Sequence, residues 1–169
     1  MRIATRLFLI ALVAALGVWL WGVLFPNPDR AIRKRLAEAA RAASFAPGES
    51  YFSRLSGAQR LSDLFATNVE VNIDIPGHQE GHWAGREEIL QAALGARATL
   101  QSLNVTFPDM TLIIGPGKES ATADLTAEAR ISGESDLFVQ EMKFTLRKDG
   151  SRWLITRVQT VQTLQNAGR

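Results

Sequence analysis

The stretch "DLFVQEMKFTLRKDGSRWLITRVQT", Asp136 to Thr160, decides the fold of this chain. Its first half alternates apolar and polar side chains, the period of a half-buried strand, and one face carries Phe138, Met142, Phe144 and Leu146. The dipeptide Asp149-Gly150 is the strongest hairpin signal in the chain, and a second strand-like run follows it. The stretch therefore predicts a hairpin of two long strands.

Three earlier segments also have the features of strands. Residues 69–75 alternate strictly, and their apolar face consists of Val69, Val71, Ile73 and Ile75. Residues 121–133 alternate in the same way, with Ala121, Ala123, Leu125, Ala127, Ala129 and Ile131 on one face. Residues 102–115 form a further predicted strand, in which Pro108 indicates a sheet edge or a bulge.

Three segments have the apolar spacing of helices. We expect Asp29 to cap the first, over residues 30–44, and Ser50 to cap the second, over residues 51–65. The expected buried face of the second helix consists of Phe52, Leu55, Leu61, Leu64 and Phe65. The third helix covers residues 86–101, with Arg86 at its start paired with a carboxylate. Strands that follow helices in this order favour an α+β fold, with the helices on one face of an antiparallel sheet.

The N-terminal residues Leu7 to Phe25, "LFLIALVAALGVWLWGVLF", form an apolar block of 19 residues without a charge. A membrane-spanning helix needs about 20 such residues, whereas the apolar region of a cleaved signal peptide has about 7–15. No A-x-A cleavage pattern follows the block. We therefore expect an uncleaved single-pass anchor in the cell (inner) membrane, with a cleaved signal peptide as the alternative.

The orientation of this anchor is open between two interpretations. Arg2 and Arg6 precede the apolar block, in the form of a bacterial-type signal anchor that exports the following domain. Five basic residues follow it within about 20 positions, which favours a cytoplasmic domain. Long domains are exported largely regardless of charge, so we favour an extracytoplasmic domain and keep the cytoplasmic one as the alternative.

The charge balance argues against a nucleic-acid-binding protein. The chain has 19 Lys and Arg against 17 Asp and Glu, and two of the basic residues lie in the short segment before Leu7. The remainder is neutral, whereas a nucleic-acid-binding domain carries a basic excess. The run "RAIRKR" from Arg30 to Arg35 is better explained by its place beside a membrane with anionic lipids.

The order of these elements resembles that of the nuclear transport factor 2-like superfamily, which includes ketosteroid isomerase and the SnoaL-like proteins. The resemblance covers residues 29–164 and rests on "RLSDLFATNVEVNIDIPG", "HWAGREEILQAAL" and "VQEMKFTLRKDGSRWLITRVQT". It implies a curved antiparallel sheet wrapped around helices to form a cone, often with an open pocket. We therefore expect a membrane anchor over residues 1–28, a cone domain over residues 29–165 and a tail over residues 166–169.

The catalytic residues of ketosteroid isomerase have no counterparts at the matching positions. Its general-base aspartate precedes a proline at the end of the first strand, where this chain has Ile75. Its protonated aspartate corresponds to Gln140, which donates a hydrogen bond but is not an acid. Its helix-borne tyrosine is missing, because the single tyrosine is Tyr51. The resemblance therefore implies a fold without isomerase chemistry, and we expect no catalytic residue.

The two histidines, His78 and His82, lie in the segment "PGHQEGHWAGR". Their spacing of four would suit a metal site on a helix, but the surrounding glycines and the proline exclude a helix there. A zinc site needs three or four ligands; only Glu80 lies nearby, and the chain has no cysteine. We expect a solvated turn, with no metal and no cofactor.

The predicted strands turn every second side chain into the cone. The candidate ligand-binding residues are Phe138, Gln140, Met142, Phe144, Ile73 and Ile75, with Trp83 at the mouth, and we expect Leu36, Phe52, Leu55 and Leu61 to complete the lining from the helices. In the competing register, Asp74, Glu141 and Lys143 would point inward and form an active site.

Two functions follow from these two registers. The first is a membrane-anchored module that binds an apolar small molecule or a protein without catalysis, and pairs with a second copy through its sheet. The second is a SnoaL-like or ketosteroid-isomerase-like enzyme acting on a small apolar substrate.

Overall fold

The structure is a computed structural model that describes residues 12, 27–74, 81–132 and 137–161. The apolar block of residues 7–25 therefore lies outside the described residues, except for Leu12. Within the described ranges, no helix combines the length and the apolar character that crossing a membrane requires. The expected anchor stays a prediction.

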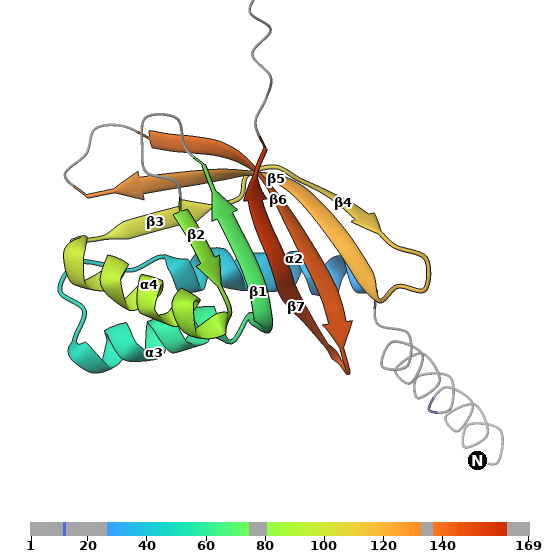
Figure 1. Cartoon of the computed structure of the whole chain (residues 1–169), viewed down its shortest axis with the longest axis horizontal. Coiled ribbons are helices and arrows are strands. Elements are labelled where there is room, and N and C mark those ends of the chain that lie inside the picture. Colours follow the sequence, from blue (N-terminus) through green and yellow to red (C-terminus); the bar gives the residue numbers. More distant parts are fainter. Residues whose placement is uncertain (1–11, 13–26, 75–80, 133–136, 162–169) are drawn as a thin grey trace, which may run out of the picture.

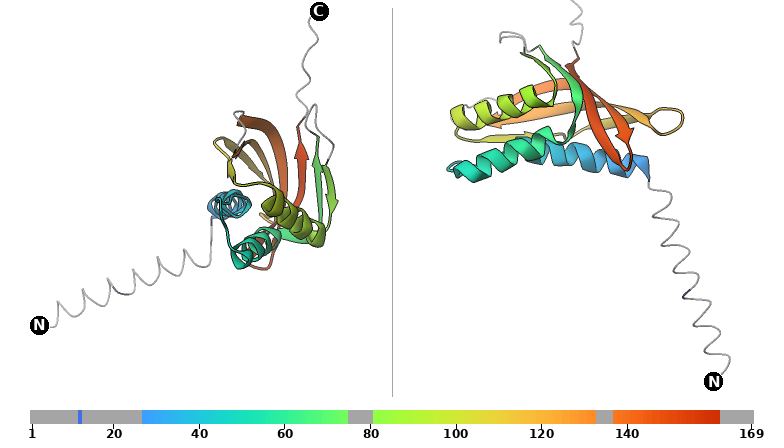
Figure 2. Two further views of the ribbon diagram at one scale, coloured as in Figure 1. Left: turned by 90° about the vertical axis from the view of Figure 1, so that its left-hand side faces the viewer. Right: turned by 60° about the horizontal axis from the view of Figure 1, so that its bottom comes forward.

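Three helices lie on the inner side of a curved sheet (Figure 1). The helices are α2 (Pro28–Ala43), α3 (Tyr51–Ser62) and α4 (Arg86–Thr99). The strands are β1 (Phe65–Ile73), β2 (Gly81–Ala84), β3 (Leu103–Thr106), β4 (Met110–Ile114), β5 (Ser120–Ile131), β6 (Leu137–Asp149) and β7 (Arg152–Thr160). Viewed from its end, the sheet curls around α2 while α3 and α4 close the open side, so the chain has the expected cone-like α+β architecture (Figure 2).

The strand order is β2-β1-β7-β6-β5-β3, and β4 also pairs with β5. The prediction of a wholly antiparallel sheet is wrong at one place, because β1 and β7 pair in parallel. Side-chain alternation identifies a strand and its two faces, but it does not tell which neighbour the strand will join or in which direction. The C-terminal hairpin places β7 at the centre of the sheet, beside β1.

The segment predicted as one strand over residues 102–115 is split in two. β3 and β4 pair with successive parts of β5, and Phe107 to Asp109 separate them. Pro108 lies in this break, at the sheet edge, as its lack of an N–H donor requires.

The β6–β7 hairpin closes through a two-residue loop, Gly150-Ser151, with Asp149 opposite Arg152. Gly150 has a φ of 58°, a left-handed conformation that favours glycine at the first position of such a loop. The predicted hairpin is confirmed.

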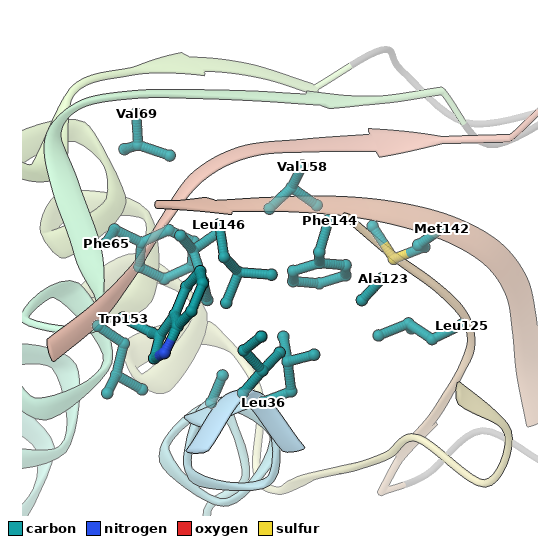
Figure 3. Packing of buried hydrophobic residues seen from close by; sticks show 14 of the residues in the cluster. Leu36, Phe65, Val69, Ala123, Leu125, Met142, Phe144, Leu146, Trp153 and Val158 are labelled. Atoms are coloured by element: carbon teal, nitrogen blue, oxygen red, sulfur yellow. The ribbon is translucent and has the colours of Figure 1, made fainter. Parts of the chain in front are cut away.

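The core lies between α2 and the inner face of the sheet. Paired residues of neighbouring strands form two buried rows across the sheet: the first joins Ala121, Leu146, Ile155 and Phe65, and the second joins Ala123, Phe144, Val158 and Val71. Trp153 fills one end of the core, Met142 and Leu125 lie at the other, and Leu36 of α2 points between them (Figure 3).

Two predictions about the helices need correction. Asn27, not Asp29, caps α2, because its side chain accepts the N–H of Asp29 at 3.0 Å. Phe52 and Leu55 of α3 were expected to be buried but are 80% and 39% exposed. The buried side of α3 consists instead of small residues, Gly57, Ala58 and Ser62, while the cap at Ser50 is confirmed.

The small residues of α3 are explained by Arg97 of α4. A Cβ atom on Gly57 would lie 2.8 Å from the guanidinium carbon of Arg97, so α3 approaches α4 this closely only with glycine there. Helical periodicity alone did not show this, because the partner of the helix is a charged side chain rather than an apolar surface.

Candidate functional site

The inner face of the sheet changes from filled to open along β6. Leu146 and Phe144 are buried beneath α2, and Met142 is 9% exposed. Beyond Met142, the inward-facing Gln140 and Phe138 are only half-buried, and they pair with Ala127 and Ala129 of β5. The structure thus places Phe138, Gln140, Met142 and Phe144 on one face of β6, in agreement with the predicted register.

Gln140 is the polar side chain at this open end. Its Nε2 atom donates to the carbonyl oxygen of Glu141 at 3.2 Å and to that of Val161 at 3.4 Å. Burial of an amide costs free energy unless the amide finds partners, and these two carbonyls provide them. The side-chain oxygen of Gln140 keeps its acceptor capacity.

β1 and β2 continue this inner face on the other side of β7. Val71 pairs with both Val158 and Trp83, so Trp83 extends the row of Phe144. The Trp83 ring lies against Gly81, which pairs with the half-buried Ile73. Trp83 therefore covers the strand end beside Ile73, and a Cβ atom at position 81 would require this ring to move. Ile75, the last of the predicted lining residues, lies outside the described residues.

A cavity of about 360 Å³ adjoins the same end of the sheet. It is lined by Asp109, Met110, Thr111, Asp124, Leu125, Thr126, Glu141, Met142 and Val161. Met142 thus borders a cavity that combines four apolar side chains, its own included, with three carboxylates.

The charged residues of the sheet lie on the outer face. Glu141 and Arg147 of β6 are exposed. Lys143 pairs with Asp124 across the strands at 3.4 Å, and the Arg157–Glu70 pair is 2.5 Å apart. Of the charges that the competing register would bury, Glu141 and Lys143 therefore point away from the cone. Asp74 directly follows β1, and its backbone N–H donates to the Thr160 hydroxyl at 3.1 Å.

His82 lies on the outer face of β2, where its Nδ1 atom is 2.5 Å from the side-chain oxygen of Asn72 on the neighbouring strand. His82 was expected in a solvated turn and lies instead in a short exposed strand, because β2 pairs with β1. His78 lies outside the described residues. In the part of the chain that the structure describes, no group of His, Cys, Asp and Glu is arranged to hold a metal ion.

Two arginines have roles that the sequence did not predict. Arg86 was expected to pair with a carboxylate, but its Nε and Nη2 atoms donate to the carbonyl oxygen of Phe65 at 3.0 and 2.6 Å. Arg97, 4% exposed, donates to Glu49 at 2.9 Å and to the carbonyl oxygen of Ala42 at 2.5 Å. A glycine in the middle of a helix, here Gly57, was the sequence signal for such a close contact.

Arg97 also borders the two polar clefts between the helices. Its guanidinium carbon lies 4.8 Å from the centre of the Phe45 ring. A cleft of about 540 Å³ on the α2 side includes Glu38, Arg41, Glu49 and Arg60, and one of about 320 Å³ includes Arg54 and the loop from Phe45 to Glu49. Arg97 of α4 donates to Ala42 of α2 and lies against Gly57 of α3, so it joins the three helices.

Neither a protein-family model nor a curated protein matches this chain. Solved structures, in contrast, are similar to this chain. A nuclear transport factor 2-like protein with a cystatin-like fold from Novosphingobium aromaticivorans has 17% identity and a TM-score of 0.62, with 92% of this chain and 90% of that chain covered.

Two further proteins from the same organism are similar in structure. A candidate scytalone dehydratase has 16% identity and a TM-score of 0.58, with 83% of this chain and 89% of that chain covered. A candidate aromatic ring hydroxylase has 14% identity and a TM-score of 0.58, with 77% of this chain and 85% of that chain covered.

This chain has the nuclear transport factor 2-like fold. Structural similarity at such low sequence identity establishes the fold and not the reaction, so the function must be argued from the side chains of the site. Of the positions that correspond to catalytic residues of ketosteroid isomerase, Gln140 faces the open end and Ile75 lies outside the described residues. The single tyrosine, Tyr51, is not at a corresponding position; it begins α3 and is 75% exposed. The nuclear transport factor 2-like fold is thus present with a different set of side chains at the described positions.

Proposed function

We propose that this chain is a single-pass membrane-anchored cone domain that binds an apolar or weakly polar small molecule without catalysis. The binding site is the open end of the inner face, between Phe138 and Gln140 on β6 and Ile73 and Trp83 on the other side of β7. The anchor is the apolar block of residues 7–25.

The inner-face register of β6 carries this proposal. Phe138, Gln140, Met142 and Phe144 face inward, while Glu141 and Lys143 face outward. The buried residues on the sheet are apolar, and the two buried polar residues of the described chain, Ser62 and Arg97, lie on α3 and α4. Proton abstraction needs a base within hydrogen-bond reach of the substrate, and this face offers an amide instead. An apolar lining with one amide suits a ligand with a single polar group.

A pair of matched variants tests the binding site. Phe138→Glu places a charge on the inner face, whereas Val139→Glu places the same charge on the outer face, where Val139 is 55% exposed. Binding of an uncharged apolar fluorophore, N-phenyl-1-naphthylamine, should weaken more than tenfold in F138E and stay unchanged in V139E. Equal binding by both variants would mean that the fluorophore binds elsewhere.

The anchor is tested by fractionation of the full chain expressed in bacteria. We expect the chain to stay in the membrane fraction through alkaline carbonate extraction, and a truncated chain that starts at Asn27 to be soluble and folded. A full chain that is soluble and trimmed near Phe25 would show a cleaved signal peptide. An alkaline phosphatase fused after Arg169 should be active if the domain is extracytoplasmic.

Two observations favour the alternative, an enzyme acting on a small apolar substrate. The cavity beside Met142 is lined by Asp109, Asp124 and Glu141, and two of the structurally similar proteins are named as a candidate dehydratase and a candidate hydroxylase. If the cavity were an active site, Glu141→Gln would abolish turnover of a bound hydroxylated aromatic compound. Binding without turnover in the unmodified chain supports the binding module.

A second copy of the chain is the protein partner that we propose. Leu137 and Val139 are 42% and 55% exposed on the outer face of β6. Exposed apolar side chains on a sheet face favour association. Light scattering of the chain from Asn27 onward should give the mass of a dimer, and Val139→Glu should shift it to the monomer.

A further inference from the structure

We propose that the outer surface of α2 and α3 lies flat on an anionic lipid bilayer. This helical surface consists of Arg30, Lys34 and Arg41 on α2, and Tyr51, Phe52, Leu55 and Arg60 on α3. The inference rests on the proposed anchor and goes beyond it, because an anchor alone leaves the orientation of the domain undetermined.

The apolar part of the helical surface is at the start of α3. Tyr51 is 75%, Phe52 80% and Leu55 39% exposed, and the Tyr51 and Phe52 rings meet edge to face with centroids 6.0 Å apart. A cluster of aromatic side chains in water has a cost that contact with another surface removes. Tyrosine in particular is enriched where a membrane meets water, because one end of its ring is polar.

The remaining residues of the helical surface are basic. Residues 27–63 contain seven Lys and Arg and four Asp and Glu, of which Asp29, Glu38 and Glu49 pair with Arg33, Arg35 and Arg97. The side chains of Arg30, Lys34, Arg41 and Arg60 are exposed and form no ion pair with another described residue. With Arg54, five exposed cations of these helices are in no ion pair with a described residue, against one exposed carboxylate, Asp63, so the two helices present a net positive charge to anionic headgroups.

Chain length brings this surface to the bilayer. If residues 7–25 span the membrane, only Pro26 and Asn27 separate them from α2, so Pro28 lies within about 10 Å of the membrane surface. α2 has 16 residues and is about 24 Å long. Phe52 belongs to α3, which follows the end of α2 that is far from the anchor. When α2 is perpendicular to the membrane, Phe52 is therefore about one length of α2 from the membrane surface. When α2 is parallel to the membrane, Phe52 reaches the headgroups.

The two helices run along the same side of the molecule, opposite the outer face of the sheet (Figure 2). A domain lying on this side keeps the sheet face with Ile113 and Val139 directed away from the lipid. The basic residues and the aromatic cluster then contact the bilayer together. Each Lys or Arg near an anionic surface contributes about 1 kcal/mol to the free energy of binding, a fivefold factor in the binding constant.

Spin labels at two matched positions test this orientation in the full chain. The chain has no cysteine, so Phe52→Cys and Ile113→Cys each give a single labelling site. Both residues are apolar and highly exposed, at 80% and 62%, but only Phe52 belongs to the helical surface. The labelled chains are reconstituted into phosphatidylcholine vesicles with and without phosphatidylglycerol, and collision with oxygen and with a neutral nickel complex is measured.

We expect the label at position 52 to favour oxygen over nickel in anionic vesicles, and the label at position 113 to favour nickel. Adding Lys34→Gln and Arg41→Gln should lower the docked population at position 52 at least about fivefold and leave position 113 unchanged. A label at position 52 as accessible to nickel as that at position 113 would overturn the inference.

Two other outcomes would also overturn it. A label at position 52 that is shielded from both reagents and broadened by a second label would show that another copy of the chain covers α3. If the chain does not sediment with vesicles at all, both the proposed anchor and this inference are wrong. If the chain sediments and the label at position 52 is exposed to water, only this inference is wrong.

Discussion

Gly57→Ala is a substitution for which helix propensity and packing predict opposite signs. In an exposed helix, alanine in place of glycine stabilises by up to about 1 kcal/mol. At position 57, however, the new Cβ atom would lie 2.8 to 3.0 Å from three atoms of the Arg97 guanidinium. Which effect is larger depends on whether that guanidinium can move.

The guanidinium is held on three sides. Glu49 and the carbonyl oxygen of Ala42 accept its hydrogen bonds, and Phe45 lies under its carbon atom. Moving it would strain or lose a hydrogen bond to a charged group, worth about 1.5–3 kcal/mol, and overpacking alone costs about 1–3 kcal/mol. Against a propensity gain of about 1 kcal/mol, we expect Gly57→Ala to destabilise the domain by about 1–2 kcal/mol.

The control is Gly95→Ala in α4. Gly95 is exposed, and a Cβ atom there would meet nothing within 4 Å, so the propensity effect acts alone. Urea unfolding of the chain from Asn27 onward should therefore show G95A more stable than the unmodified chain and G57A less stable, with unchanged slopes. In an Arg97→Ala background, Gly57→Ala should become stabilising.

Equal stabilisation by Gly57→Ala and Gly95→Ala would refute this reasoning. It would mean that the Arg97 side chain moves aside at no cost, and that the hydrogen bonds to Glu49 and Ala42 do not fix the three helices together.

Three further predictions test the fold by the same urea measurement. Trp153→Ala should cost about 3–5 kcal/mol because this ring fills one end of the core, whereas Tyr51→Ala should change stability by less than about 0.5 kcal/mol because Tyr51 is exposed; similar values would contradict the core assignment. Asn27→Ala should cost about 1 kcal/mol and Asp29→Ala less, and the reverse order would restore Asp29 as the cap of α2. Glu70→Gln should cost under about 1 kcal/mol and less in high salt, since both partners of this ion pair are about half exposed, and a larger cost would show a desolvated pair.

The strands and their faces could be predicted because strand periodicity is local. Val69 and Val71 are buried and Glu70 is exposed, as the alternation of "VEVNIDI" requires. The same reasoning gave the inward register of Phe138 to Phe144. The parallel pairing of β1 with β7 could not be predicted in this way, because it depends on contacts between segments about 90 residues apart.

The buried face of α3 was predicted wrongly at Phe52 and Leu55, whereas Leu64 and Phe65 are buried and Leu61 packs against the core, as expected. The prediction assumed that a helix buries its largest apolar residues, and Phe52 and Leu55 were assigned to the core. The Arg97 guanidinium lies against Gly57, where a larger residue would meet it, so this side of α3 is buried with a glycine. The exposed aromatic residues that result are the basis of the proposed membrane contact.

Methyl resonances of the methionines give the most direct test of the proposed binding site. Of the three methionines of the chain, Met110 and Met142 lie in the described fold, and both pair with Leu125 on the inner face. In a chain from Asn27 onward labelled at the methionine methyl carbons, N-phenyl-1-naphthylamine should shift the Met142 resonance together with that of Met110, and the F138E variant should show no shift. Binding of the fluorophore with both resonances unchanged would contradict a site at the open end of the cone.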